Sequence, residues 1–312
     1  MKLDQNLKIV VLQGGFSKER EVSLKTAKAI VSALEEGGFK NVATVDVKQG
    51  FVKQLLTQDI DVAVNALHGN YGEDGTIQGL LESLDIPYTG AGVEASALCM
   101  NKFVSKLLMQ YNGVATADYQ YIRIEEAFKD IEAKADALGY PLVIKPCHEG
   151  STYGLKVVQK AEDFLDSYEW CKPYGQTFIL EKYISGREIT VAVLNGKCLP
   201  IVEISPKSGF YDYEAKYTPG KTEFACPAQL SSSLQQQAET LAYKSAQILG
   251  VLDFCRVDMM LDNDQAFVLE VNTLPGMTPT SLFPRAALAA GMSFFDLLQV
   301  LIFQALQRKE KT

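Results

Sequence analysis

Short apolar runs alternate with helical periodicity through the first hundred residues. The runs lie at 9–12, 42–47 and 62–67. Each is followed by glycine or a polar loop, and the spacing of apolar residues predicts a helix over 18–36. This alternation is typical of βαβ units, which build a parallel sheet that is buried on both faces. Ligands bind at the carboxyl edge of such sheets, so we expect the polar loops 13–21 and 68–79 to face one site.

From residue 101 onward the pattern changes to a mixed α+β one. Predicted helices lie at 101–112, 125–138, 231–249 and 293–308. Predicted strands lie at 142–144, 177–180, 188–194, 199–204, 254–261 and 266–271. The charges in 125–138 flank apolar residues at helical spacing, as on a solvated helix face, and we assign them no function. The length of 312 residues allows two or three domains.

Composition excludes several classes of protein. With 47% apolar and 22% charged residues, the chain is neither disordered nor fibrous. A net charge of -8 without a basic stripe argues against a nucleic-acid partner. The apolar stretch 297–306 is too short to span a bilayer, and the first residues lack an apolar signal region, so we expect a cytoplasmic protein without a membrane partner. The six cysteines are dispersed without a C-x-x-C pair, which favours buried reduced thiols over zinc ligands.

The segment 255–272 carries the most informative polar pattern. Two apolar strands separated by 262–265 predict a β-hairpin. For a loop with an odd number of residues, the predicted pairs are Asp262 with Ala266, Asp258 with Glu270, and Arg256 with Asn272. The last four polar residues then share one face of the sheet, because side chains alternate along a strand. The residues predicted on the opposite face are Val257, Met259, Leu269 and Val271.

Two carboxylates and an amide oxygen on one sheet face suit Mg²⁺, which prefers hard oxygen ligands. The guanidinium of Arg256 beside them could hold phosphate oxygens bidentately. The same pattern also fits a cross-strand ion network on a solvated sheet face.

A glycine-rich loop follows the predicted strand that ends in Lys145. Its sequence, KPCHEGSTYG at 145–154, can place a cation and several backbone N–H groups around a polyphosphate. The loop is neither a Walker motif nor G-x-G-x-x-G, and it also fits a surface loop without a ligand. Further on, 181–188 joins two strands and could pass an adenine edge, with Glu188 either at the ribose hydroxyls or on the surface.

Six blocks in series make the chain resemble D-alanine:D-alanine ligase of the ATP-grasp superfamily. They are QGGFSKEREVS at 13–23, HGNYGEDG at 68–75, YTG at 88–90, KPCHEGSTYG at 145–154, YDYEAKY at 211–217 and NTLPGMT at 272–278. The blocks span essentially the whole chain in the family's order. The resemblance implies an N-terminal Rossmann-like parallel-sheet domain (1–100), a central ATP-grasp lobe (101–185) and a C-terminal ATP-grasp and catalytic lobe (186–312), with ATP between the two α+β lobes.

The resemblance also implies the reaction and a role for each matching residue. ATP phosphorylates the carboxylate of one D-alanine, and the amine of a second displaces phosphate. The implied ATP-binding residues are Lys102, Lys145, Glu181, Tyr183 and Glu188. The implied ligands of two Mg²⁺ ions, or of Mn²⁺ in their place, are Asp258, Glu270 and Asn272. The implied catalytic residues are Glu19, Ser151, Tyr217, Arg256 and Gly276, and the implied substrate-binding residues are His68, Lys216, Ser281 and Leu282.

Within that set, Glu19 would anchor the ammonium of the first D-alanine, linked by hydrogen bonds to Ser151 and Tyr217. Arg256 and the N–H of Gly276 would hold the oxyanion of the tetrahedral intermediate. The family further implies a homodimer. Taken alone, His68 also fits a core histidine.

Three positions depart from the family pattern: Asn101 stands where aspartate is usual, Cys147 and His148 fill a variable part of the loop, and Cys255 precedes Arg256. Two rival functions remain at this stage. One is ligation of D-alanine to D-lactate, against which the tyrosine at 217 argues. The other is an ATP-binding module without catalysis, against which the intact acids and Arg256 argue.

Overall fold

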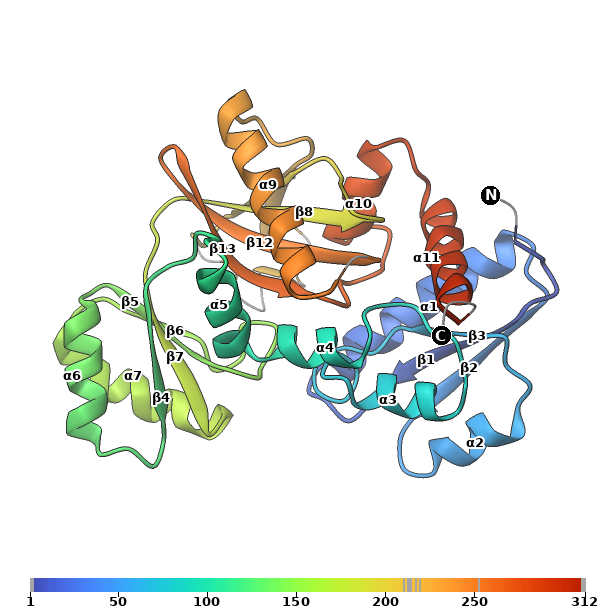
Figure 1. The fold of residues 1–312 in the computed structure, drawn as a ribbon, viewed down its shortest axis with the longest axis horizontal. Coiled ribbons are helices and arrows are strands. Elements are labelled where there is room, and N and C mark those ends of the chain that lie inside the picture. Colours follow the sequence, from blue (N-terminus) through green and yellow to red (C-terminus); the bar gives the residue numbers. More distant parts are fainter. Residues whose placement is uncertain are drawn as a thin grey trace.

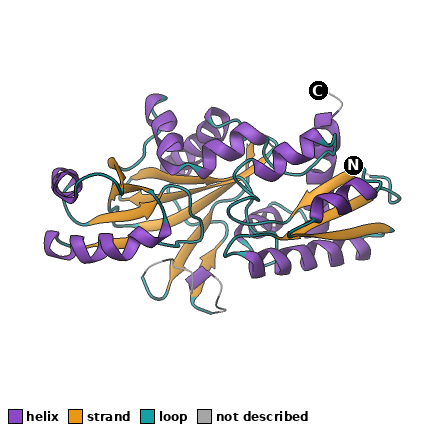
Figure 2. Ribbon diagram, turned by 90° about the horizontal axis from the view of Figure 1, so that it is seen from below, coloured by secondary structure: helices purple, strands orange, loops and turns teal. Residues whose placement is uncertain are grey.

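The computed structural model describes residues 3–209, 211, 215–216, 218, 220–251 and 253–309, and the strands within these residues form three sheets (Figure 1). The strand orders are β2-β1-β3 in the first sheet, β4-β7-β5-β6 in the central sheet, and β11-β10-β8-β12-β13 in the third, where β9 also pairs with β8. Figure 2 shows helices on both sides of these strands.

The first sheet is parallel, which confirms the βαβ prediction. Its strands are β1 (Lys8–Gly14), β2 (Asn41–Val47) and β3 (Val62–Asn65). Its helices are α1 (Arg20–Glu36), α2 (Phe51–Thr57) and α3 (Thr76–Ser83). Alternate residues of β1 enter two apolar cores, one shared with α1 and the other with α2 and α3. The sheet is therefore covered on both faces.

Two elements end earlier or begin later than predicted, each because a side chain bonds the backbone. The helix predicted from residue 18 begins at Arg20, since Ser17 Oγ accepts the N–H of Glu19 at 3.2 Å and donates to the carbonyl of His68 at 2.5 Å. Strand β3 stops at Asn65, whose side-chain oxygen accepts the N–H of Leu67 at 3.1 Å. Both bonds shape the loops at the carboxyl edge.

Helices α4 (Val93–Met100) and α5 (Lys102–Tyr111) connect the first sheet to the rest of the chain. Asn101 caps α5, because its side-chain oxygen accepts the N–H of Val104 at 3.1 Å. An aspartate could make the same bond, so this departure from the family pattern leaves the helix start intact.

The central sheet consists of β4 (Tyr119–Arg123), β5 (Leu142–Pro146), β6 (Lys156–Val158) and β7 (Thr177–Lys182). Helices α6 (Phe128–Leu138) and α7 (Phe164–Cys171), with the 3-10 turns η1 (Ala161–Asp163) and η2 (Lys172–Tyr174), accompany it. The helix predicted from residue 125 begins at Phe128. Glu126 instead closes a turn in which its carboxylate accepts the N–H of Arg123 at 2.8 Å.

The third sheet is antiparallel. Its strands are β8 (Arg187–Leu194), β9 (Lys197–Cys198), β10 (Val202–Pro206), β11 (Thr222–Ala225), β12 (Phe254–Asp262) and β13 (Gln265–Asn272). Helix α9 (Ser232–Ile248) packs on one face, where its alanines meet Val191, Val257 and Val268. Strand β12 lies between β8 and β13, so the predicted hairpin forms one end of the sheet, with β13 as its edge strand.

The hairpin confirms two predicted pairs and corrects the third. Arg256 pairs with Asn272 and Asp258 with Glu270, but Asp262 pairs with Gln265 rather than Ala266. The loop has two residues, not an odd number, and a β-bulge after Asp258 takes up the difference. The bulge also overturns the prediction for Leu269, which lines the cavity described below while Val268 enters the core.

The last two helices, α10 (Leu282–Ala289) and α11 (Phe294–Lys309), return to the first sheet. Their buried residues share one core with β1, β3 and α1, and this core also receives Ala192 and Leu194 of β8 (Figure 1). Among the described residues, no single helix is long and apolar enough to cross a membrane. Helices α10 and α11, which are bent by 105° relative to each other, together have the length and composition of a membrane span, and nothing else indicates one.

Candidate active site

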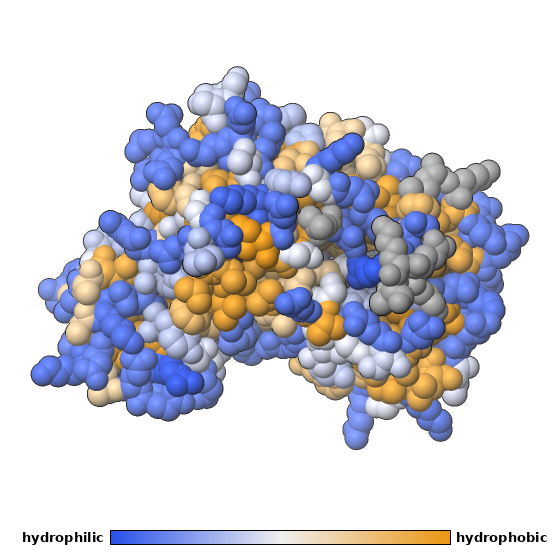
Figure 3. All heavy atoms as spheres, viewed as in Figure 1, coloured by the Kyte–Doolittle hydropathy of each residue, from blue (hydrophilic) through white to orange (hydrophobic). Residues whose placement is uncertain are grey.

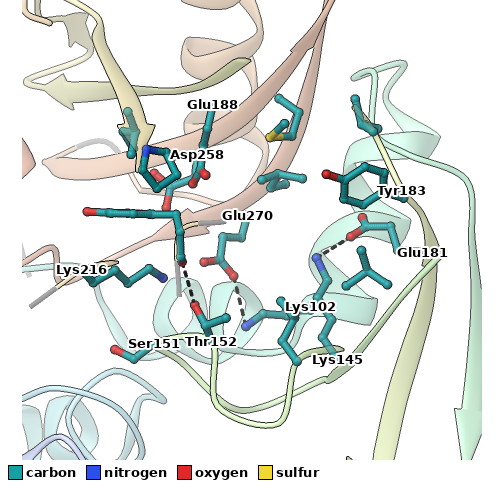
Figure 4. Close-up of a pocket in the computed structure, with 18 of the residues that line it drawn as sticks. Lys102, Lys145, Ser151, Thr152, Glu181, Tyr183, Glu188, Lys216, Asp258 and Glu270 are labelled. Carbon is teal, nitrogen blue, oxygen red and sulfur yellow. Dashed lines mark hydrogen bonds and ion pairs between the residues drawn. The ribbon is translucent and has the colours of Figure 1, made fainter. Parts of the chain in front are cut away.

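A cavity of about 380 Å³ lies between the central and third sheets. It gathers nine of the residues that the resemblance implies: Lys102, Lys145, Ser151, Glu181, Tyr183, Glu188, Lys216, Asp258 and Glu270 (Figure 4). These come from α5, β5, the loop after β5, β7, the loop after β7, β8, the segment before β11, β12 and β13, so chain segments far apart in sequence converge. Figure 3 shows the face of the molecule that is seen in Figure 1. Apolar residues gather near the middle of this face, and hydrophilic residues surround them.

Two lysines enter the cavity from the central side (Figure 4). Lys102 Nζ lies 3.1 Å from Glu270 Oε2 and donates to the carbonyl of Glu149 at 2.8 Å. Lys145 Nζ lies 2.5 Å from Glu181 Oε2. Burial would lower the pKa of Lys102, but the Glu270 carboxylate outweighs it and the pKa is raised. Two lysine side chains therefore line the cavity where an anion such as a polyphosphate could bind.

Neighbouring cations hold two carboxylates of the cavity, those of Glu270 and Glu181, in the charged form. Burial would raise the pKa of Glu270, yet Lys102, Lys145 and Lys216 together lower it to about 2. Glu181 is buried against two lysines, and they hold its pKa below the ordinary value despite that burial.

Asp258 is held by two neighbours on the third sheet. Arg256 donates to both of its carboxylate oxygens at 2.8 Å, and Thr190 Oγ1 donates to Oδ1 at 2.6 Å. Asp258 is 8% exposed, so this bonding fixes the carboxylate at the cavity surface. Glu188 behaves differently: burial first, and then the charges of Asp258 and Glu270, raise its pKa to about 7.

The donor set on the hairpin fits a hard divalent cation. Asp258 and Glu270 are directly paired across β12 and β13, and Asn272 follows on the same strand. Carboxylate and amide oxygens are the ligands that Mg²⁺ accepts, with water or phosphate completing the shell. Within the described residues no group of three or more His, Cys, Asp or Glu side chains gathers as a metal cage. The remaining ligands would thus come from a bound phosphate, as is usual for Mg²⁺.

Glu19 lies next to the cavity, where three segments meet. Ser151 Oγ donates a hydrogen bond to Glu19 Oε1, joining the first sheet's edge to the loop after β5. A Cβ at Gly69 would lie 2.7 Å from Glu19 Oε2, and one at Gly150 would lie 3.1 Å from it, so glycines leave room for the carboxylate. Burial and Glu73 raise the pKa of Glu19, which Ser151, His68 and Lys216 partly oppose. A buried acid of this kind suits an ammonium ligand.

His68 stands beside Glu19 in the loop after β3. Its Nε2 lies 3.1 Å from Thr26 Oγ1, and its Nδ1 lies 3.6 Å from Glu73 Oε1. The predicted meeting of loops 13–21 and 68–79 is confirmed by Ser17, which donates to the carbonyl of His68. His68 is 7% exposed and bonded, so its geometry also fits the core histidine considered above.

The loop after β5 takes an unusual backbone path. Ser151 and Thr152 have φ of 47° and 65°, in the left-handed region. Thr152 Oγ1 donates to the carbonyl of Tyr211 at 3.3 Å, which ties the loop to the segment before Lys216. Lys216 Nζ lies 5.2 Å from the centre of the Tyr211 ring and lines the cavity. Tyr217 lies outside the described residues.

Asn272, the last residue of β13, and the implied residues after it do not line the cavity. Asn272 Oδ1 accepts the N–H of Leu274 at 3.0 Å, which starts the turn that leads to Gly276. A Cβ at Gly276 would lie 3.1 Å from Ser281 Oγ, so the two segments approach closely. Ser281 Oγ lies 2.7 Å from Thr278 Oγ1, and Leu282 is buried at the start of α10.

The cysteines beside the site are structural. The six are free thiols, as predicted. Cys255 is 0% exposed in the core under α9, on the face opposite Arg256, and burial raises its pKa well above the ordinary value. Cys147 is buried, and its carbonyl accepts the N–H of Lys102 at 3.0 Å. Burial in an apolar core favours a packing role for Cys255.

Sequence reasoning missed two polar residues of the site. Thr190, which bonds Asp258, stands alone among apolar neighbours in β8, and that isolation was a usable signal. Lys106 bonds Glu181 from α5, four residues after Lys102 and between the buried Ser105 and Met109. A lysine on a buried helix face was the corresponding signal there.

Comparisons with known proteins agree with this geometry. Residues 108–303 match the family model described as D-ala D-ala ligase C-terminus, and residues 40–91 match D-ala D-ala ligase N-terminus. A D-alanine–D-alanine ligase of Syntrophotalea carbinolica is 44% identical over 98% of each chain. Two crystal structures of the Bacillus anthracis ligase superpose over 98% of this chain and 99% of theirs. The one complexed with ATP has 33% identity and a TM-score of 0.85, and the other has 36% and 0.87.

Proposed function

The chain belongs to the D-alanine–D-alanine ligase family, and on this basis we propose that it joins two D-alanines into D-alanyl-D-alanine at the expense of ATP, for peptidoglycan synthesis. Its fold is the expected ATP-grasp arrangement with an N-terminal parallel sheet, as the superposed structures have it. The observation that carries the proposal is the convergence of two lysines and two paired acids on one cavity.

ATP would lie in the cavity between the central and third sheets. Lys102 and Lys145 would hold its phosphates, since both ammonium groups line the cavity. Glu181, Tyr183 and Glu188 would contact the adenine and ribose at the opposite end. Their place in the cavity lining supports this assignment.

Asp258, Glu270 and Asn272 would hold two Mg²⁺ ions, with Mn²⁺ as a substitute. When bound, the ions would neutralise phosphate charge during transfer of the γ-phosphoryl group. Lys102 pairs with Glu270 and Arg256 with Asp258, so two cations lie beside the proposed metal ligands.

The first D-alanine would place its ammonium at Glu19, which Ser151 and Tyr217 would hold in place and which His68 adjoins. Its carboxylate would then point toward the phosphates, where phosphorylation makes one oxygen a leaving group. The amine of the second D-alanine would attack the acyl phosphate, and its carboxylate would lie near Lys216, Ser281 and Leu282. Arg256 and the N–H of Gly276 would stabilise the oxyanion, a role in which one donor typically contributes about 3 kcal/mol.

The wider setting is also proposed. We expect the enzyme in the cytoplasm, where ATP is available, and as a homodimer. We keep domain boundaries at 1–100, 101–185 and 186–312, with the qualification that α10 and α11 share a core with the first sheet.

The test is phosphate release from ATP and Mg²⁺ with D-alanine, with L-alanine, and with D-alanine plus D-lactate, with products identified by mass. Phosphate release matched by D-alanyl-D-alanine is the expected result. A depsipeptide as the main product would move the assignment to a D-alanine–D-lactate ligase. No product in any pairing would favour an ATP-binding module without catalysis.

A further inference from the structure

A lysine that has no place in the proposed substrate contacts is completely buried behind the cavity. Lys106 is 0% exposed and lies on α5, one turn after Lys102, so both side chains leave the same face of the helix. Burying an ammonium group is costly unless it is paired and hydrogen-bonded. Its partners therefore indicate what it does.

Lys106 is bonded to two residues from different parts of the chain. Its Nζ donates to Glu181 Oε1 on β7 and to Thr116 Oγ1 in the segment before β4. Thr116 Oγ1 in turn donates to the carbonyl of Val268 at 2.9 Å, and Val268 N–H donates to Ala115 at 2.9 Å. The ammonium is thus fixed to the open edge of β13 in the third sheet.

Glu181 shares its carboxylate between two lysines. Lys106 takes Oε1 from behind, and Lys145 takes Oε2 at 2.5 Å from the cavity side, as Figure 4 shows for Lys145 and Glu181. Each oxygen has its own cation, so the carboxylate plane has one preferred orientation. Lys145 takes its position from Oε2, and hence from Lys106.

We propose that Lys106 is a positioning residue for ATP, which orients Glu181 so that Lys145 stands at the phosphates and Glu181 faces the base. The inference rests on the proposed function, since it assigns ATP to this cavity. Without Lys106, Oε1 loses its charged donor. Glu181 then turns both oxygens to Lys145 and draws that ammonium away from the nucleotide, while the Glu19 subsite is untouched.

The first test compares Lys106→Met with the wild type and with Lys134→Met. Lys134 is a matched control because it also forms an ion pair, with Nζ 2.6 Å from Glu126 Oε2. It lies on α6, beside the central sheet, and neither it nor Glu126 lines the cavity. Partners that orient a ligand-binding group typically contribute about 10- to 100-fold. We expect the KM for ATP to rise by about that factor in Lys106→Met. The KM for D-alanine should stay within about twofold.

Two further readouts separate positioning from support of the fold. The preference for ATP over GTP should fall in Lys106→Met, because Glu181 no longer faces the base in one orientation. A lower melting temperature with unchanged KM for ATP and unchanged nucleotide preference would overturn the proposal. A rise in the KM for ATP in Lys134→Met of the same size would also overturn it.

A second pair of variants, of which the double variant preserves the net charge, keeps the proposal testable if Lys106→Met does not fold. Glu181→Gln and Glu181→Gln/Lys106→Met should have the same KM for ATP within about twofold, because Lys106 acts through the Glu181 carboxylate. A further loss in the double variant would contradict this route. Direct titration with MgATP measures the same differences without turnover, so the result stands apart from whether the wild type forms dipeptide.

Discussion

The hairpin wall of the cavity and the Glu19 subsite are assembled in opposite ways. On the hairpin, Asp258 and Glu270 are neighbours in a strand ladder, and their positions follow from backbone pairing at one end of a six-stranded sheet. At the subsite, Glu19 meets Ser151 across 132 residues of sequence, through a side-chain hydrogen bond and two glycines that leave space. One is built by the ladder and the other by contacts between loops.

Because of this difference, we expect the two regions to respond differently to substitution of a side chain. A sheet position keeps its neighbours when one side chain changes, so a substitution on the hairpin should remove chemistry and leave the fold. Loop contacts depend on each partner, so a substitution at Glu19 should change substrate affinity in a graded way.

Glu270→Ala should lower turnover on the order of 10³-fold while the fold persists, because one proposed metal ligand and the partner of Lys102 are lost together. Dipeptide formation measures the turnover, and circular dichroism measures whether the fold persists. Asp264→Ala, an exposed acid in the same hairpin, is the control and should behave as wild type. Near-normal turnover in Glu270→Ala would remove this residue from the metal site.

Glu188 should make the free energy of unfolding fall as the pH rises from about 4.5 to about 7. Its pKa is raised to about 7 in the folded state, so over that range the unfolded chain releases a proton that the folded chain keeps. With allowance for its partial exposure, the loss is about 2–3 kcal/mol. Glu188→Gln should flatten this slope in denaturant titrations at several pH values. The control Glu223→Gln changes an exposed acid and should leave the slope as in the wild type. If Glu188→Gln also kept the wild-type slope, Glu188 would not be the group that titrates.

Glu19→Gln should raise the KM for D-alanine by about 10- to 100-fold, with the KM for ATP unchanged, since a neutral amide cannot form an ion pair with an ammonium. Glu21→Gln, on the exposed side of α1, is the matched control. Steady-state kinetics with each substrate varied in turn would decide. Equal changes in both KM values would mean that the subsite and the ATP cavity are not independent.

Asn101→Asp should leave both turnover and stability close to wild type, while Asn101→Ala should lower the free energy of unfolding by about 1 kcal/mol. The reason is that either oxygen can accept the N–H of Val104 and begin the helix that carries Lys102. Thermal unfolding of the two variants measures the difference. A stable Asn101→Ala protein would show that the cap is dispensable here.

The same contrast explains what could be predicted from the sequence. The parallel first sheet and the pairs Asp258 with Glu270 and Arg256 with Asn272 follow from the alternation of apolar and polar residues, which is local information. The bulge that brings Leu269 into the cavity is not visible in that alternation, because one extra residue shifts the register without changing the composition. The family resemblance brought Glu19 and Ser151 together before any geometry was known.

The residue roles that could not be predicted from the sequence depend on packing between distant segments. No pattern indicates that Ser17 sets the start of α1, or that Asn65 sets the end of β3, by bonding the backbone. Lys106 was overlooked because a lysine in a helix is ordinarily exposed, and only the meeting of α5 with β7 makes it the buried partner of Glu181. The sequence contains these residues, but their roles arise in three dimensions.

Helix α11 covers the face of the first sheet that α1 shares, although it is the last described element of the chain. A ribosome that has made the first hundred residues therefore presents a sheet with part of one apolar face still uncovered. Domains usually fold as they emerge, N-terminal first. Here the native form of that first unit must wait until translation reaches α11, and chaperones would meet the exposed face in the interval.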